Sequence, residues 1–429
     1  MTELRKSLRL VDGLAMVVGI TVGSGIFRTP GLVAARLGRP ALTFVAWVLG
    51  AGLALLGALC FAELTTRLPR AGGKYVYIRE AFGRRGAFVV GLMESVAING
   101  AAIAAIGVAA GEFLVRLAGW SPTLSQALGA AFVALFTAVN LLGVQSGRWV
   151  QNVVTAAKVL ALGGVVVLAF ALGTGAGWHG APVAGAPRGW AVWGALAAAS
   201  PAVIWTYYGY PDLAKIAEEV VDPGRTLPRL FLGGLAIVAS LYLLLNAAFL
   251  HVLPIGQIAA SKLVAADVAV AILGASGGAV VAALALLVVL ASLNGNVFVT
   301  PRVLFGLARD RLAPTALASV NRGGTPWVAM LLVGGVAIAL AATGTFERLI
   351  SLAIVWILVI DGWAVLALFR LRRREPIAPF RVPLYPWVPL ALFGVYGALL
   401  VGTAVAQPML IVQALAVLVG AYGLSWTVR

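Results

Sequence analysis

The sequence predicts an all-α membrane protein with twelve transmembrane helices. Of its 429 residues, 62% are hydrophobic and only 11% are charged, and the mean hydropathy is +1.01. Soluble globular chains are about half apolar and about a quarter charged, and disordered chains are poor in apolar residues. Both classes are therefore excluded. Two further observations support the prediction: long apolar segments recur along the chain, and glycine and proline cluster in two of them.

The apolar segments are each long enough for a membrane helix, which needs about 20 residues. They lie at about 10–36, 41–66, 87–115, 124–143, 149–173, 190–214, 229–253, 277–306, 326–345, 347–370, 386–405 and 408–427. The first segment is longer than the apolar core of a signal peptide, so we interpret it as a retained span. An even number of spans places both chain ends on the same side.

The distribution of Lys and Arg predicts the orientation. With both ends in the cytoplasm, 23 of these residues lie on the cytoplasmic side and seven on the outer side. This asymmetry agrees with the positive-inside rule, and we expect a multi-pass protein of a prokaryotic plasma (inner) membrane. The net charge of +16 does not indicate a nucleic-acid partner, because the basic residues separate the apolar segments instead of forming one patch.

Spans one and six each contain an expected interruption. Span one carries Gly19, Gly23 and Gly25 near its middle, and span six reads Trp-Thr-Tyr-Tyr-Gly-Tyr-Pro at 205–211. Pro211 lacks a backbone donor, which favours a helix break. Interrupted helices five spans apart are the pattern of two inverted five-helix repeats with a site at the bilayer midplane. The alternative is that the glycines only allow close helix packing.

A helix broken inside the membrane exposes two ends of opposite polarity. The free N–H groups attract anions and the free carbonyls attract cations. An α-amino acid carries a carboxylate and an ammonium that match both ends. We expect the carboxylate at the backbone around Ser24 and the ammonium at carbonyls of both spans, with the aromatic rings of span six covering the ligand. The predicted substrate-binding residues are Ile20, Gly23, Ser24, Gly25, Ile26, Trp205, Tyr208 and Gly209.

Three stretches resemble the amino acid–polyamine–organocation superfamily, in particular its prokaryotic L-type amino acid transporters. They are Gly-Ser-Gly-Ile-Phe at 23–27, the segment 61–83 after span two, and Glu-Glu at 218–219 with Asp-Pro-Gly-Arg-Thr-Leu-Pro at 222–228. The resemblance implies a LeuT-type fold that works by alternating access. Ser24 and Gly25 match the carboxylate-binding turn of the family, and Trp205 falls at the position of its aromatic gate.

The resemblance also implies a division of the chain. The transport core would cover 1–385, with repeat one at about 10–173 and repeat two at about 190–371, and two additional helices would occupy 386–429. The sequence departs from the family in span six, where Tyr-Tyr-Gly-Tyr at 207–210 replaces Tyr-Asp-Gly-Trp, so side-chain selectivity cannot be transferred. No cysteine lies at 116–124, so no disulfide-linked accessory subunit is expected.

Lys158 lies inside span five, where an ionisable residue is a functional candidate. The alternative is a lysine that extends to the inner surface. The resemblance implies that its ammonium takes the place of the sodium ion of coupled relatives, between carbonyls of span one and the hydroxyl of Ser292. Glu94 and Asp361 lie at similar depth, and each either pairs with Lys158, relays protons or satisfies a local contact.

The most specific functional prediction is a sodium-independent secondary transporter of neutral L-amino acids, working by exchange or by proton coupling through Lys158. A cationic amino acid or polyamine antiporter is the alternative, but span one offers no acid between Gly19 and Phe27, and Arg28 adds positive charge. A channel or receptor-like protein is less favoured, because no filter residues recur. We expect no enzyme and no cofactor, since the chain has two histidines, one cysteine and no zinc-protease or phosphate-loop motif.

Overall fold

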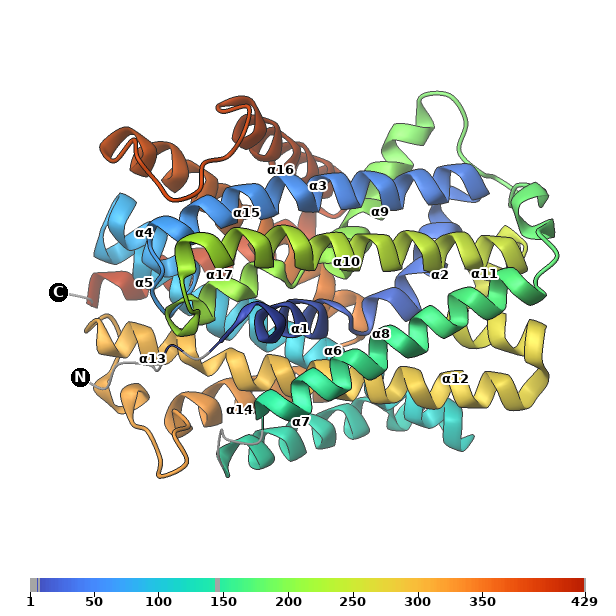
Figure 1. Cartoon of the computed structure of the whole chain (residues 1–429), viewed down its shortest axis with the longest axis horizontal. Helices are drawn as coiled ribbons and strands as arrows, with labels where there is room; N and C mark the ends of the chain where they lie inside the picture. The colour runs from blue at the N-terminus through green and yellow to red at the C-terminus, as the bar shows by residue number, and fades with distance from the viewer. Residues whose placement is uncertain (1–5, 7, 143–146, 428–429) are drawn as a thin grey trace.

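The described part of the chain is helical throughout. The computed structural model describes residues 6, 8–142 and 147–427, and in these residues the only strand-like feature is an isolated bridge between Leu8 and Val220. Most of the long helices run side by side along the long axis of the molecule (Figure 1). Eight helices of the described chain are long and apolar enough to cross a membrane, or nine when one bent pair is counted as a single span. The all-α membrane architecture is thus confirmed, whereas twelve spans and an inverted repeat remain predictions.

Each predicted apolar segment contains helix. In the first half the helices are α1 (Leu10–Thr21), α2 (Gly25–Leu37), α3 (Pro40–Arg67), α4 (Lys74–Phe82), α5 (Arg84–Leu92), α6 (Asn99–Ala118), α7 (Ser125–Leu141) and α8 (Gly147–Leu172). In the second half they are α9 (Ala191–Tyr207), α10 (Pro223–Val252), α11 (Ile255–Ala260), α12 (Val264–Val299), α13 (Pro301–Arg309), α14 (Trp327–Thr343), α15 (Phe346–Arg374), α16 (Trp387–Ala406) and α17 (Pro408–Leu424). The π-helix η1 (Met93–Ile98) joins α5 to α6, and the 3-10 helix η4 (Tyr210–Glu219) follows α9.

One predicted break and one predicted boundary can be compared with the structure. The sixth segment is interrupted where the sequence predicts: α9 ends at Tyr207, Gly209 adopts φ 155°, and Pro211 lies at the start of the narrower helix η4. The eighth segment was expected to begin at residue 277, but α12 begins at Val264 and bends at Gly274, where φ is 75°. In both cases a glycine with left-handed backbone geometry changes the helix direction.

The centre of the bundle is α6 with its neighbours. In the segment 84–118, 83% of the most apolar window is buried, compared with 17% in α16. The start of α6 is rich in alanine and glycine, and small residues allow neighbouring helix backbones to approach closely. Helix α6 packs against α7, α12, α14 and α15. It therefore forms one wall of the interior in which the candidate site lies.

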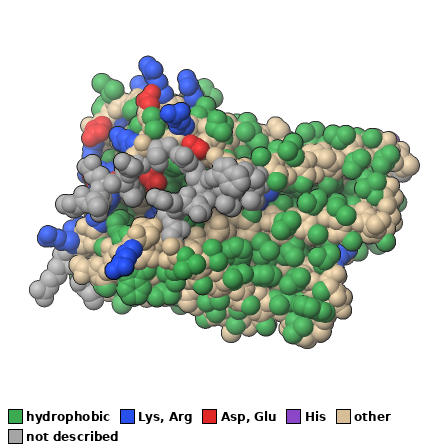
Figure 2. Space-filling view, turned by 60° about the horizontal axis from the view of Figure 1, so that its bottom comes forward, with side chains coloured by type: hydrophobic (Ala, Val, Ile, Leu, Met, Phe, Trp, Pro, Cys, Tyr) green, Lys and Arg blue, Asp and Glu red, His purple; other side chains and the backbone are tan. Residues whose placement is uncertain are grey.

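Charged side chains gather at one end of the molecule. On the face drawn in Figure 2 most Lys, Arg, Asp and Glu side chains lie at the left end, and hydrophobic side chains cover the rest. Helices α4, α5 and α13 lie at this end in Figure 1, as do both ends of the described chain. We call it the charged end. The terminal residues 1–5 and 428–429 lie outside the described residues, and the predicted cytoplasmic location of the termini remains a prediction.

Candidate functional site

The first span is broken where the glycine cluster predicts. Helix α1 ends at Thr21, α2 begins at Gly25, and their axes differ by 44°. A Cβ atom added to Gly25 would lie 2.9 Å from the Cα of Thr206 on α9, and one added to Gly23 would lie 2.7 Å from the Oγ of Ser292. The glycines therefore let the break approach two neighbouring helices more closely than any other residue would allow.

The second break lies directly against the first. Between α9 and η4, Gly209 takes up its positive φ, and a Cβ atom there would lie 2.5 Å from Thr21 Oγ1 and 2.8 Å from Thr21 Cα. The Thr206 hydroxyl donates a hydrogen bond to the Thr29 hydroxyl of α2 at 2.9 Å. The ends of four half-helices thus meet inside the protein.

Lys158 binds the broken end of α1. Its Nζ donates to the carbonyl oxygens of Gly19 at 3.0 Å and Val22 at 3.2 Å, and the side chain is buried. The negative end of a helix favours a cation. The side chain does not extend to the surface of the molecule, and its ammonium lies at the free carbonyls of this helix end.

Two hydroxyl groups satisfy the remaining free carbonyls of α1. Ser292 of α12 donates to the Ile20 carbonyl at 3.2 Å, and Tyr242 of α10 donates to the Thr21 carbonyl at 2.9 Å. Each carbonyl oxygen has a second lone pair and can accept another hydrogen bond. The end of α1 is therefore fixed in place while it still presents acceptors.

The start of α2 lacks a capping side chain. Ser24 occupies the cap position without making a cap hydrogen bond, and its buried Oγ has no partner. The buried Oγ1 of Thr21 is also unpaired. Because buried polar groups are nearly always hydrogen-bonded, two unpaired hydroxyls next to a free helix N-terminus mark a place for a polar ligand. A helix N-terminus favours an anionic group.

A cavity of about 40 Å³ lies between the two breaks, which is room for a few water-sized groups. Most of the predicted residues line it: Ile20, Gly23, Ser24, Gly25, Trp205, Tyr208, Gly209 and Ser292. Ile26 does not, because its side chain packs in the protein core. Lys158 lies behind the break of span one and also does not line the cavity.

Several lining residues were missed by the sequence-based prediction. They are Thr21, Ile98, Asn99, Ala102, Ile106, Thr206, Asp212, Asn296 and Ile357. One signal was available, because Ile98, Ala102 and Ile106 follow each other at intervals of four and form one face of a helix. Asn296 likewise lies four residues after Ser292. Asp212 is the important omission, since it places an acidic side chain at the cavity.

Next to the cavity, toward the charged end, lies a buried ion pair that is contacted by the cavity-lining residue Tyr208; we call this pair the floor. Lys74 of α4 lies 2.6 Å from Asp361 of α15, and both are buried. The Tyr208 hydroxyl donates to Asp361 at 3.1 Å and accepts a hydrogen bond from Lys74. Asp361 is thus the partner of Lys74 and not of Lys158. Tyr208 contributes to this floor through its hydroxyl as well as to the cavity wall.

Arg28 lies on the other side of the break and does not line the cavity. It forms ion pairs with Glu112 of α6 and, at 3.5 Å, with Glu347 of α15. The positive charge that the sequence placed next to the substrate is therefore neutralised by two carboxylates. The positive charge that Arg28 was expected to add near the substrate therefore no longer supports a preference for neutral substrates.

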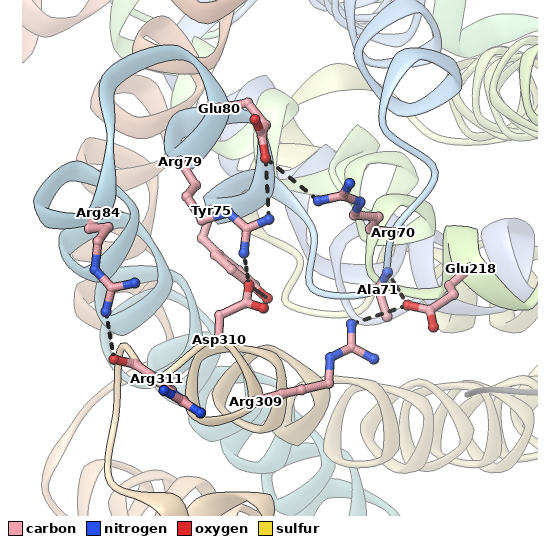
Figure 3. A network of polar contacts seen from close by, with 10 residues as sticks. All are labelled: Arg70, Ala71, Tyr75, Arg79, Glu80, Arg84, Glu218, Arg309, Asp310 and Arg311. Carbon is pink, nitrogen blue, oxygen red and sulfur yellow. Dashed lines mark hydrogen bonds and ion pairs between the residues drawn. The ribbon is translucent and has the colours of Figure 1, made fainter. Parts of the chain in front are cut away.

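A second polar network, formed by residues on and around α4, η4 and α13, lies at the charged end (Figure 3). Arg79 and Tyr75 of α4 both contact Asp310 after α13, Tyr75 at 3.2 Å. Burial, together with the Asp310 carboxylate, raises the pKa of the Tyr75 phenol above its ordinary value, so it stays protonated and donates. Glu218 of η4 accepts from the backbone N–H of Ala71 at 2.9 Å and from Arg309 at 3.3 Å. The network ties the segment of α4 to η4 and α13.

Comparison with known proteins agrees with this architecture. The profile of the family described as "Amino acid permease" matches residues 8–421. The serine/threonine exchanger SteT of Bacillus subtilis is 31% identical, and the match covers 98% of this chain and 97% of SteT. The mouse b(0,+)-type amino acid transporter 1 and the human Asc-type amino acid transporter 1 are each 28% identical; their matches cover 95% of this chain and 84% and 79% of the relatives. The chain belongs to the amino acid permease family, within the amino acid–polyamine–organocation superfamily.

Proposed function

We propose that this protein is a secondary transporter that exchanges neutral L-amino acids across the plasma membrane, without sodium, by alternating access in a twelve-helix LeuT-type fold. The observation that carries the proposal is the meeting of two helix breaks around a buried cavity, with the unpaired hydroxyls of Thr21 and Ser24 facing it. The family supports amino acid transport, and relatives that are themselves transporters or exchangers support the exchange mode.

The geometry supports recognition of a zwitterion by backbone groups. The substrate carboxylate binds the N–H groups at the start of α2 and the Ser24 hydroxyl. The substrate ammonium binds the second lone pairs of carbonyls at the end of α1, near Ile20, and carbonyls at the end of α9, near Trp205. A site made from dipoles that belong to three half-helices changes whenever one of them moves, which couples binding to the conformational change.

Neutral substrates are favoured by the charge state of the cavity wall. Asp212 lies 2.6 Å from Lys215, so its carboxylate already has a cationic partner. The cavity is small, and asparagine and serine side chains line part of it, which favours small polar side chains such as those of serine and threonine. The second candidate is a cationic amino acid, whose side chain would displace Lys215 from Asp212.

Lys158 supports independence from sodium. Its ammonium is held by two carbonyl oxygens at the end of α1, so a sodium ion would compete with a covalently attached cation for these ligands. A fixed cation also removes the need for a bound metal cation at this helix end. We therefore assign Lys158 the role of a built-in cation that holds the broken end of α1.

Counterflow in proteoliposomes tests the proposal. Vesicles loaded with unlabelled L-serine should accumulate labelled L-serine, and external L-threonine or L-alanine should compete, while replacing sodium by potassium should have no effect. L-Leucine, L-arginine and putrescine define the selectivity. Competition by putrescine or arginine but not by serine would contradict the neutral substrate class. Absence of counterflow with every amino acid would contradict the proposed function itself.

A further inference from the structure

A cluster of five buried charged residues lies between the cavity and the charged end. Its members have exposed fractions of 8% or less and come from α4, η1, η4 and α15. They are Lys74, Glu94, Asp212, Lys215 and Asp361. We call this group the buried charge cluster. It is linked to the substrate cavity, because Asp212 also lines that cavity.

The cluster holds three carboxylates and two ammonium groups. Lys74 pairs with Asp361 at 2.6 Å, and Lys215 pairs with Asp212 at 2.6 Å. Glu94 is left without a close partner, since its Oε1 lies 3.8 Å from Lys215 and its buried Oε2 has no hydrogen-bond partner. One negative charge is therefore uncompensated, and the unpaired oxygen locates it on Glu94.

The local structure around Glu94 is unusual for a membrane helix. Glu94 lies in the π-helix η1, and such insertions occur frequently at functional sites. The chain before α4 closes over it, because a Cβ atom on Gly73 would lie 3.5 Å from Glu94 Oε1 and 3.6 Å from Oε2. Movement of α4 together with Gly73 would therefore open a route from Glu94 to the charged end.

The groups around Glu94 come from several elements. Lys74 and Tyr77 approach from α4, Asp212 and Lys215 from η4, Tyr208 from the break before η4, and Asp361 from α15. Helices α5, α13 and α14 also pack against η1. Their described charged side chains are engaged elsewhere: Arg84 with the Arg311 carbonyl, Arg85 with Trp426, Arg302 with Glu219 and Arg309 with Glu218. Helix α14 carries no ionisable residue.

We propose that Glu94 is a proton-binding site and that one proton accompanies each amino acid through it. A buried carboxylate without a cationic partner of its own is costly, and binding a proton neutralises it. Protonation leaves two carboxylates for two ammonium groups, so the closed cluster is neutral. Lys215 connects the proton site to the substrate, because it contacts both Asp212 and, at 3.3 Å, Asn99, and both residues line the cavity. The inference rests on the proposed amino acid transport and extends it.

This assignment gives Glu94 and Lys158 different roles. Lys158 contacts two carbonyl oxygens at the end of α1, whereas Glu94 belongs to the cluster at the floor. Loss of Lys158 should impair exchange and proton movement together, because the end of α1 loses its cation. Neutralising Glu94 should remove proton movement alone, because glutamine has nearly the same shape as a protonated glutamate and leaves the cluster neutral.

The test compares net uptake with exchange in proteoliposomes that contain the pH dye pyranine. In the wild-type protein, an inward proton gradient of two pH units should raise the uptake of labelled L-serine at least fivefold. Addition of L-serine outside the vesicles should acidify the vesicle lumen. Glu94→Gln should keep counterflow at symmetrical pH but lose both the stimulation and the acidification. Glu94→Asp should retain both. Glu375→Gln, which alters an exposed carboxylate, is the matched control and should behave as the wild type.

Four results would overturn the inference. A wild-type protein that shows counterflow but no gradient stimulation and no acidification carries no proton. If the Glu94→Gln variant still acidifies the lumen, the proton binds at another residue. If the Glu94→Asp variant keeps counterflow but loses acidification, a carboxyl group at this position is not sufficient for proton transport. A Gln variant that loses counterflow assigns Glu94 to the exchange machinery instead. Absence of wild-type counterflow, by contrast, rejects the proposed function first.

Discussion

At the scale of single residues, the site depends on glycines that allow two backbones to touch. Gly25 faces the Cα of Thr206, and Gly209 faces the Cα of Thr21, each at less than 3.0 Å from where a Cβ atom would stand. A backbone atom cannot rotate away as a flexible side chain can. Even the smallest side chain at either position must push the two breaks apart.

Gly25→Ala should therefore strongly reduce transport without preventing folding. Overpacking by one methyl group costs about 1–3 kcal/mol, and here that cost falls on the contact between the breaks. We expect serine counterflow to drop at least tenfold. Gly52→Ala is the control, because a Cβ atom there meets nothing within 4 Å. Equal counterflow in the two variants would show that close contact of the breaks is not required.

Lys158→Ala should reduce exchange at least tenfold and lower the melting temperature. The change leaves the carbonyls of Gly19 and Val22 without their donor, and each unpaired buried group costs about 1–3 kcal/mol. Counterflow and thermal unfolding in detergent measure the two effects. Lys262→Ala, which alters a lysine at the rim of a separate surface cavity, serves as the control. Unchanged exchange in Lys158→Ala would remove the cation role.

What the sequence could predict at this scale follows from local signals. The breaks were predictable because Gly23, Gly25 and Pro211 act on their own backbone. The position of Lys158 at carbonyls of span one came from the family resemblance, whereas the identity of these carbonyls, those of Gly19 and Val22, required the fold. Asp212 was missed because η4 brings it back toward the cavity, and the spacing of residues in the sequence does not predict this direction of the chain.

At the scale of elements, α4 closes the floor below the cavity. Lys74 stands at its first position and reaches Asp361 of α15, 287 residues further along the sequence. The network of Arg79 and Tyr75 with Asp310 holds the rest of the helix (Figure 3). Alternating access requires one end of the cavity to open, so we expect α4 to move away from α15 when the charged end opens.

Removing only one member of the ion pair between Lys74 and Asp361 should lower stability strongly, whereas replacing both by uncharged residues should lower it little. Lys74→Met leaves a buried carboxylate without its main partner, which typically costs about 3–5 kcal/mol, whereas removing both charges is often neutral. We expect Lys74→Met to lower the melting temperature strongly and Lys74→Met with Asp361→Asn to recover most of it. Thermal unfolding of purified protein measures both. A double variant no more stable than the single one would contradict a direct pairing.

The sequence predicted most helices but few of their ends. Long apolar segments indicate a helix without fixing where it starts or stops, and α12 begins at Val264 and continues through a bend at Gly274, ahead of the predicted start at residue 277. Helix α4 was not predicted because it is short and carries Lys74, Arg79 and Glu80 among its nine residues. Its helical state depends on burial against other elements, which the sequence alone does not reveal.

At the scale of the whole molecule, charge is concentrated at one end (Figure 2). The positive-inside rule predicts that the charged end faces the cytoplasm. Single cysteines in a Cys60→Ser background test this orientation. In intact cells an impermeant maleimide should label Thr123→Cys, which lies in an exposed loop expected outside, but not Thr315→Cys, which is exposed near α13 at the charged end. Labelling of Thr315→Cys but not of Thr123→Cys would show that the orientation is the opposite of the predicted one.

The central claim is that exposed backbone dipoles of two broken helices recognise both charges of an amino acid. Competition against bound labelled L-serine tests this claim most directly, with unlabelled L-serine, with L-serinamide, which lacks the carboxylate, and with 3-hydroxypropionate, which lacks the ammonium. The account predicts that only L-serine competes, with both analogues at least a hundredfold weaker. Displacement by either analogue at the concentration at which serine acts would contradict it.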